Sequence, residues 1–208
     1  MPLTRKPQGP TPTAGAADYD TAAAGLRSTE TDVRWRSARV LGAFAHAVAP
    51  LGAAAATEAD ARVREAIFTS LARIGSPDSV TALLPHVRSD DAARRTAAMD
   101  ALKAMPQVLS VAIARLLKDG DADVRVLACD LARELPSGDA TALLAVPLES
   151  DPEVNVCAAA VDVIADVGSA EALEPLRRCA LRFPGQPFLE FAIRVACDRI
   201  GAQAPSRG

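Results

Sequence analysis

The sequence repeats itself about every 31 residues, and this period restricts the possible folds more than any other feature. Six segments share one register and begin at residues 33, 63, 94, 124, 156 and 189. Their sequences are VRWRSARVLGAFA, VREAIFTSLARIG, RRTAAMDALKAMP, VRVLACDLARELP, VCAAAVDVIADVG and LEFAIRVACDRIG. A period of about 20 to 50 residues is typical of proteins built by stacking one small structural unit many times.

Each segment has the pattern of a helix that is buried along one side. The first, fifth, eighth, ninth and twelfth places are apolar or small in almost every segment, which is the spacing of one helical stripe. A glycine or proline at the thirteenth place favours the end of the helix there in every segment but the first, which has Ala45. Shorter helical stretches between the segments are expected near residues 17–28, 47–57, 79–89, 108–120, 139–150 and 169–183.

The composition favours an all-α fold. The chain has one Trp, one Tyr and five Phe among 208 residues, so Ala, Leu, Val and Ile must form the core. Such small side chains suit close-packed helices better than strands, which favour aromatic and β-branched residues. Because one helix pair cannot cover its own apolar faces, we expect the pairs to stabilise one another by stacking.

The ends of the chain differ from the repeats. Residues 1–16 contain four prolines and no helical period, which predicts a disordered N-terminal tail. We expect a single repeat domain over residues 17–201 and a short tail over 202–208. No apolar run is long enough to predict a signal peptide or a membrane span, so a cytoplasmic protein is expected. Only three lysines accompany many arginines and alanines, a composition that suggests a bacterial source.

The repeated pattern is Asp-x-x-Val-Arg-x-x-Ala-Ala-x-x-Leu-Gly-x-Ile-Gly, best kept in DADVRVLACDLARELP (121–136) and ADARVREAIFTSLARIG (59–75). It resembles the HEAT-like repeats of phycobilisome bilin lyases and of many bacterial proteins, and the resemblance covers nearly all of residues 18–201. It implies a right-handed α-α superhelix, a HEAT-like solenoid of about six two-helix repeats. It also implies that the Val-Arg helix is the second of each pair and lines the concave side.

The resemblance further implies a ladder of arginines along the stack. The arginine at the second place of each segment would pair with acidic or polar residues of the preceding turn. The arginines at this place are Arg34, Arg64, Arg95 and Arg125. Cys157 and Glu190 replace the arginine in the fifth and sixth units, where the ladder is therefore not expected.

The sequence contains few groups that could carry out catalysis. His46 and His86 are the only histidines, lie 40 residues apart and are expected at the surface. The chain has no HExxH, GxSxG or glycine-rich phosphate-binding motif. No two of the four cysteines have zinc-ligand spacing, and buried thiols are expected, with Cys157 the only candidate nucleophile. We therefore predict a non-enzymatic protein with no catalytic residue, cofactor or metal site.

Acidic residues on the Val-Arg helices give the candidate site. The third, seventh and eleventh places lie opposite or beside the buried stripe, so they should face the concave groove. The carboxylates at these places in units three to five are Asp100, Asp130, Glu134, Asp162 and Asp166. Trp35 and Phe191 occupy the third place at the two ends of the stack. One hypothesis is an acidic groove that holds a basic segment of a partner protein. The alternatives are solvated surface charges and, for Trp35, a cap over the first unit.

These observations favour a protein–protein interaction scaffold or adaptor. The alternative is a bilin-lyase-like subunit acting on a tetrapyrrole chromophore, which rests on the resemblance alone. The formal net charge of −3 and the acidic groove argue against nucleic acid as a partner, and the same charge argues against binding to an anionic membrane surface.

Overall fold

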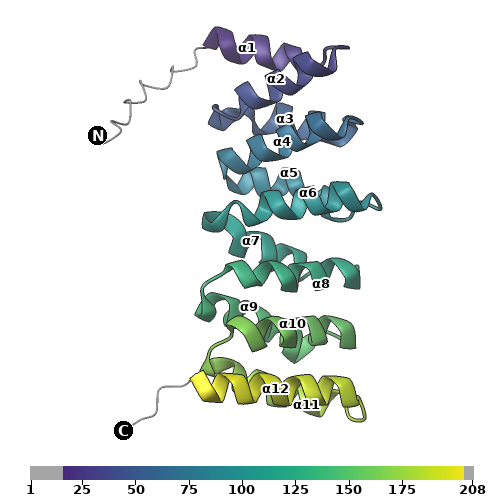
Figure 1. The fold of residues 1–208 in the computed structure, drawn as a ribbon, viewed down its shortest axis with the longest axis vertical. Coiled ribbons are helices and arrows are strands. Elements are labelled where there is room, and N and C mark those ends of the chain that lie inside the picture. The colour runs from purple at the N-terminus through teal and green to yellow at the C-terminus, as the bar shows by residue number, and fades with distance from the viewer. Residues whose placement is uncertain (1–15, 204–208) are drawn as a thin grey trace, which may run out of the picture.

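The computed structural model describes residues 16–203, and within that range it contains twelve α-helices in two layers. Figure 1 shows the helices stacked as successive pairs along one long axis, with the N-terminal and C-terminal pairs at opposite ends. Helix α1 begins at Ala16 and α12 ends at Gln203. The tails expected at residues 1–16 and 202–208 lie almost entirely outside the described residues.

Each of the six units consists of an odd-numbered helix followed by an even-numbered helix. The odd-helix layer contains α1 (Ala16–Gly25), α3 (Val48–Thr57), α5 (Pro77–Val87), α7 (Pro106–Leu116), α9 (Ser137–Ser150) and α11 (Leu173–Arg182). The even-helix layer contains α2 (Thr31–Leu41), α4 (Ala61–Ile74), α6 (Ala92–Lys103), α8 (Ala122–Leu131), α10 (Val154–Val167) and α12 (Pro187–Gln203). Short 3-10 helices occur at η1 (Ala45–Ala47), η2 (Ala132–Glu134) and η3 (Ala170–Ala172).

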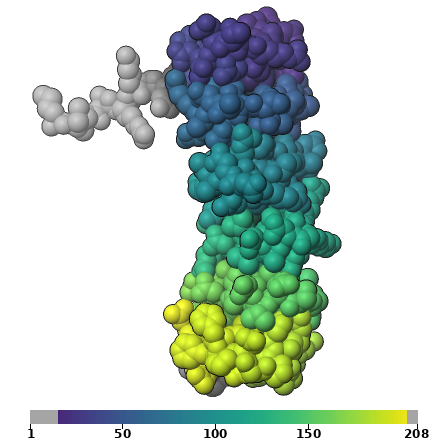
Figure 2. Space-filling model, turned by 90° about the vertical axis from the view of Figure 1, so that its right-hand side faces the viewer, coloured from purple at the N-terminus to yellow at the C-terminus, as the bar shows by residue number. Residues whose placement is uncertain are grey.

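The units contact one another in sequence order. Helices of one layer pack mainly against the next helix of the same layer and against the partner helix of the same unit. Figure 2 shows the consequence, an elongated molecule whose colour changes in successive bands from one end to the other. The fold is therefore an all-α solenoid, as the repeat period predicts. No helix in the described part of the chain combines the length and the apolarity needed to cross a membrane.

Local signals explain where several even helices begin and end. Asp60, Asp91 and Asp121 are the N-caps of α4, α6 and α8, and each carboxylate accepts a hydrogen bond from a backbone N–H of the first turn. Helix α4 ends at Ile74, and its C-cap Gly75 has a left-handed φ of 63°, which favours glycine. The expected helix end at Gly201 is wrong. Helix α12 continues through it to Gln203, since glycine weakens a helix without forbidding it.

The predicted apolar stripe is buried between neighbouring helices. In α8, for example, Val124 and Ala128 are buried, as are the later stripe residues Leu131 and Ala132. The exceptions are Val33 and Val40 in α2, whose side chains are 39% and 41% exposed. These are the first and eighth places, which elsewhere pack on a preceding unit. The first unit has no such neighbour within the described residues, so both valines line a surface hollow between α1 and α2.

His86 is not at the surface, contrary to the expectation from sequence. It is only 6% exposed, and its ring lies 4.8 Å from that of Phe68, centroid to centroid. Burial lowers the pKa of His86, and the nearby cations Arg94 and Arg64 lower it further. His46 is exposed, as expected, and stacks on Tyr19 with ring centroids 4.3 Å apart.

The arginine at the second place of units one and four connects two interhelical turns, its own preceding turn and that of the next unit. Arg34 donates to the carbonyl oxygens of Ser28 and Thr29 in its own preceding turn, and its Nε lies 2.8 Å from Oε2 of Glu58 in the next unit. Arg125 repeats this arrangement with the carbonyl of Asp119 and, at 2.6 Å, with the carboxylate of Asp151. The resemblance implied that the arginine pairs with residues of the preceding turn. In the structure the preceding turn supplies carbonyl oxygens, and the carboxylate comes from the turn of the following unit. Each such arginine ties two neighbouring units together.

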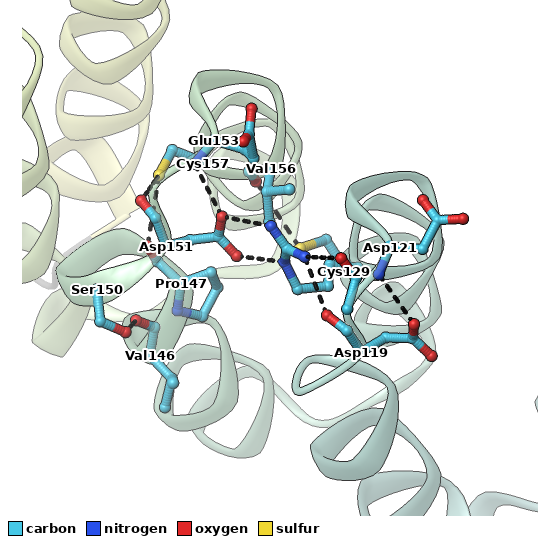
Figure 3. A network of polar contacts seen from close by, with 12 residues as sticks. Asp119, Asp121, Cys129, Val146, Pro147, Ser150, Asp151, Glu153, Val156 and Cys157 are labelled. Atoms are coloured by element: carbon cyan, nitrogen blue, oxygen red, sulfur yellow. Dashed lines mark hydrogen bonds and ion pairs between the residues drawn. The ribbon is translucent and has the colours of Figure 1, made fainter.

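The carboxylates of these ion pairs are held ionised. The hydrogen bond from Arg34 lowers the pKa of Glu58, against the opposing effect of burial. Burial of Asp151 would raise its pKa, but hydrogen bonds from Arg125 and from the backbone N–H of Glu153 lower it. Figure 3 shows Asp119, Asp151 and Cys157 in this network between units four and five. Arg64 makes a longer contact of the same kind, 3.5 Å from Asp91.

Another arginine serves the fifth unit, where Cys157 replaces the arginine at the second place. The thiol of Cys157 lies 3.7 Å from the carbonyl oxygen of Asp151, six residues earlier, which is the acceptor position that Arg34 and Arg125 use. Arg182, at the end of α11, donates to the same carbonyl and to that of Leu148. The short side chain of cysteine leaves room for this guanidinium. In the sixth unit the polarity is reversed, because Glu190 accepts a hydrogen bond from the backbone N–H of Gly185.

The ladder is interrupted between units three and four. Arg95 donates to the carbonyl of Ser89 but makes no ion pair with any described residue. The carboxylate in the equivalent position, Asp119, binds Arg88 instead, at 2.7 Å from its Nε. Helices α6 and α8 make only sparse contact and lie further apart than other neighbours of the layer (Figure 1). A pocket of about 350 Å³ is lined by Arg95 of α6 and by Val124, Val126 and Leu127 of α8.

We predict that Arg125→Gln lowers the free energy of unfolding by about 2 kcal/mol, because it leaves the carboxylate of Asp151, whose side chain is only 5% exposed, without its cation. Urea or thermal unfolding measures the loss. Arg177→Gln is the matched control: its ion pair with Glu174 is exposed on both sides, so the change should be below about 0.5 kcal/mol. Equal losses in the two variants would contradict a buried structural role for Arg125.

We predict that His86 makes the protein less stable as the pH falls below about 6.5. Its pKa is lowered in the folded state, so the unfolded chain binds the proton more readily and gains stability on acidification. The slope is at most about 1.4 kcal/mol per pH unit. Melting temperatures between pH 7.5 and 5 should fall less steeply for His86→Gln than for the wild type. The exposed control His46→Gln should keep the wild-type pH dependence. Parallel curves for wild type and His86→Gln would refute the assignment.

Candidate interaction surface

The third, seventh and eleventh places of the even helices form one surface, which we call the even-helix surface. Most of these side chains are exposed, including Glu65 and Thr69 of α4 and Thr96 and Asp100 of α6. Trp35 and Asp130 are partly buried on it. The helical spacing therefore correctly placed these residues on the solvent side of the layer. The charges on this surface, however, do not form the continuous acidic groove that was expected from the sequence.

Trp35 lies at the N-terminal end of this surface between two arginines. The guanidinium carbons of Arg39 and Arg62 lie 4.6 and 4.4 Å from the centroid of its ring. Such cation–π contacts are worth about 0.5–1 kcal/mol at exposed sites and more where the cation is desolvated. The side chain also packs against the core, and Arg62 pairs with Asp32. Trp35 is thus covered from the solvent by cations of the first two units.

Three of the five predicted carboxylates gather around one arginine. Arg133 of η2 forms ion pairs with Asp130, Asp162 and Asp166. Lys103 also contacts Asp130, at 3.4 Å, and Arg199 contacts Asp166, at 2.9 Å. Three cations thus face three carboxylates, and the cluster has no net formal charge. We call this set of six residues the Arg133 cluster; it connects units three to six.

Sequence reasoning identified the carboxylates of this cluster and missed the cation at its centre. Arg133 occupies the tenth place, next to the eleventh, whereas only the third, seventh and eleventh places were expected to face the concave groove. Its spacing of three residues from Asp130 is a known ion-pair spacing on a helix and could have indicated the contact. The partners Asp162 and Asp166 are 29 and 33 residues away in sequence. Only the stacking of unit five on unit four reveals these contacts.

The other two predicted carboxylates have no ion-pair partner. Asp100 and Glu134 are exposed, and neither forms a hydrogen bond or ion pair with the described residues. Asp100 lies on a groove between α4 and α6 of about 580 Å³, whose opposite wall carries Glu65. Glu65 stands at the third place of its unit, where it was visible in the sequence but was not selected. The structure thus places a carboxylate on each wall of this groove.

Phe191 lies at the C-terminal end, distant in sequence from the groove. Its side chain is 56% exposed, and the guanidinium carbon of Arg194 lies 5.3 Å from the ring centroid. Phe188 and Leu181, in the same unit, are also exposed. The two aromatic residues proposed as anchors therefore differ, since Trp35 is covered by arginines and Phe191 is largely open to solvent.

The thiols are placed for packing. Cys129, Cys157 and Cys179 are buried, and Cys197 is partly buried. Burial raises the pKa of Cys129 to about 12. A hydrogen bond from Cys179 lowers the pKa of Cys157, but its sulfur is fully buried and directed at the carbonyls of Pro147 and Asp151. Burial of this kind prevents contact with a substrate. Among residues 16–203, no cluster of three metal-ligating side chains is found.

We predict that Arg133→Gln lowers the free energy of unfolding by about 1 kcal/mol, because it leaves three neighbouring carboxylates with one central cation fewer. The loss should shrink in 0.5 M salt, which screens exposed charges. In an Asp162→Asn background it should also be smaller, since part of the interaction is already absent. Additive effects of Arg133→Gln and Asp162→Asn, measured by thermal unfolding, would show that the ion pair is not energetically coupled.

Comparison with solved structures finds helical repeat proteins of low sequence identity. An archaeal HEAT-like repeats protein from Thermococcus onnurineus NA1 is 14% identical with a TM-score of 0.47, and the match covers 88% of this chain and 87% of the other. Human deoxyhypusine hydroxylase is 16% identical with a TM-score of 0.45, covering 91% and 86%. The complex of CpcE and CpcF of phycocyanin lyase from Nostoc sp. PCC7120 is 17% identical with a TM-score of 0.43, covering 96% and 98%.

The sequence itself matches a family model. Among curated protein sequences there is no significant match. The family model described as HEAT repeats, however, matches residues 19–103 and 109–187, which together form more than half of the chain. The matched ranges contain the first five units and the start of the sixth. Together with the stacked helix pairs, this match shows that the chain belongs to the HEAT-repeat family.

Proposed function

We propose that this protein is a non-enzymatic scaffold that binds another protein through its even-helix surface. HEAT-like stacks expose long surfaces of this kind, and the repeat resemblance assigns the surface to the concave side. The observation that supports the proposal most directly is the pair of exposed carboxylates without counter-ions, Asp100 and Glu134, on a layer whose other predicted carboxylates are neutralised. Such charges favour a partner with a basic segment and would act mainly on association rate and specificity.

The structure changes the residues on which this proposal depends. Asp130, Asp162 and Asp166 were expected to attract the partner, but their contacts with Arg133 reduce the field that they present. We therefore assign the electrostatic role to Asp100, Glu134 and the newly identified Glu65. Phe191 is retained as an exposed apolar anchor, whereas Trp35 is assigned to packing between its two arginines.

The bilin-lyase-like alternative gains no support from this surface. Binding of an extended conjugated chromophore would call for aromatic or polar groups gathered in one cavity. The groove between α4 and α6 is lined mainly by alanine, and Phe68 is its one aromatic lining residue. Three of the four thiols, those of Cys129, Cys157 and Cys179, are buried and not accessible for attachment.

We predict that charge reversal at Asp100 and Glu134 abolishes partner capture. The intact protein carrying Asp100→Lys and Glu134→Lys serves as bait beside the wild type, and bound proteins are quantified by mass spectrometry. The matched control is Asp20→Lys with Asp139→Lys, which makes the same change of charge at two exposed positions on α1 and α9 of the odd-helix layer. Partners should be lost only from the even-helix variant, and the melting temperatures should stay similar because all four sites are exposed. Loss from both variants, or from neither, would contradict the proposal.

A further inference from the structure

The groove between α4 and α6 has walls of small side chains. Its α4 wall contains Glu65, Thr69 and Ala72, which lie on one side of that helix at successive turns. The α6 wall contains alanines at 92, 93, 97, 101 and 104 together with Thr96 and Asp100. Alanine ends at its methyl group, so the space that longer side chains would fill stays open. The lining residues span about two turns on the α4 wall and about three turns on the α6 wall.

Both acidic side chains of the groove are free of internal partners. Glu65 and Asp100 are exposed, and within the described residues neither takes part in a hydrogen bond or an ion pair. This sets them apart from Asp130, Asp162 and Asp166, each of which contacts at least one cation. The groove therefore has a negative charge on each wall.

Every cation of α4 and α6 is engaged elsewhere. In α4, Arg62 contacts Asp32 and Trp35, Arg64 contacts Asp91, and Arg73 donates to the carbonyls of Arg39 and Gly42. These contacts hold the three guanidinium groups on neighbouring units or at the helix start. None of the three arginines lines the groove.

The same holds for α6. Arg94 donates to the carbonyls of Ala55 and Glu58, and Arg95 donates to that of Ser89. Lys103 contacts Asp130 in the Arg133 cluster. The two carboxylates of the groove thus remain without a cation even though six cationic residues belong to the two helices that form it.

We propose that this groove, the α4–α6 groove, binds a segment of a partner protein that carries an arginine or lysine among small apolar residues. The cation would lie between Glu65 and Asp100, and the apolar residues would pack on the alanine walls. Arginine suits the site especially, because its planar guanidinium can donate to two carboxylates at once. Phosphate-bearing ligands are disfavoured by the same charges. The inference deepens the scaffold function proposed above and rests on it.

The test uses the full chain as bait for a displayed library of random 16-residue peptides. A selected peptide is then synthesised with a fluorescent label, and its Kd is measured by anisotropy. We expect selected sequences to be enriched in arginine or lysine next to apolar residues. Glu65→Gln with Asp100→Asn should weaken binding at least about 10-fold, and 0.5 M salt should weaken binding to the wild type.

Two further variants separate the groove from the surface as a whole. Ala93→Trp, at an exposed position, should fill the groove and reduce binding to a similar extent while the melting temperature stays near that of the wild type. Asp20→Asn with Asp139→Asn makes the same charge change on α1 and α9 of the odd-helix layer and should leave Kd within about twofold.

Selection of peptides without basic residues, or a Kd that does not respond to Glu65→Gln with Asp100→Asn, would overturn the groove as the binding site. A peptide whose Kd does not respond to the groove variants but whose binding is abolished by Glu134→Lys would also overturn the groove as the binding site. That result would leave the proposed scaffold function intact. Failure to enrich any peptide also overturns the groove proposal, and the capture experiment with Asp100→Lys and Glu134→Lys then decides separately on the even-helix surface.

Discussion

The structure depends on burial of the apolar stripe of each helix pair against the next pair. No unit can cover its own stripe, so a residue such as Ala128 is buried only because units on both sides are present. Val33 and Val40 show the same constraint at an end of the stack, where identical places stay partly exposed. The stability of such an array therefore depends on the interfaces between neighbouring units. The polar contacts between the units add to the stabilisation that burial provides.

Most ion pairs among the described residues join neighbouring units, and the examples here span 24 to 33 positions of the chain. Arg34 reaches Glu58, Arg125 reaches Asp151, and Arg133 reaches Asp162 and Asp166. Where one partner is taken by another residue, as Asp119 is by Arg88, α6 and α8 make only sparse contact. The ion pairs thus join successive units of the stack.

The same pairing determines which charges are available to a partner. An aspartate paired with Arg133 presents little net field, whereas the carboxylates of Asp100 and Glu134 form no ion pair with the described residues and are exposed. The alanines of α4 and α6 leave room beside the unpaired carboxylates of Glu65 and Asp100. This combination of space and charge is local to the second and third units. Function in a repeat protein of this kind therefore depends on the small differences between its units.

The sequence alone determined the helix pairs, their number, the buried stripe and the family, because a 31-residue period and a helical spacing are properties of a single unit repeated. It also placed Glu65, Asp100 and Asp130 on the solvent side of their helices, since that follows from the turn of one helix. Only the tertiary structure decided which of these carboxylates is neutralised, that Arg182 serves the turn beside Cys157, that His86 is buried, and that a groove opens between α4 and α6. The physical reason is that each of these depends on a contact between units, where the position of a side chain is set by the stacking distance and by competition among several charged neighbours.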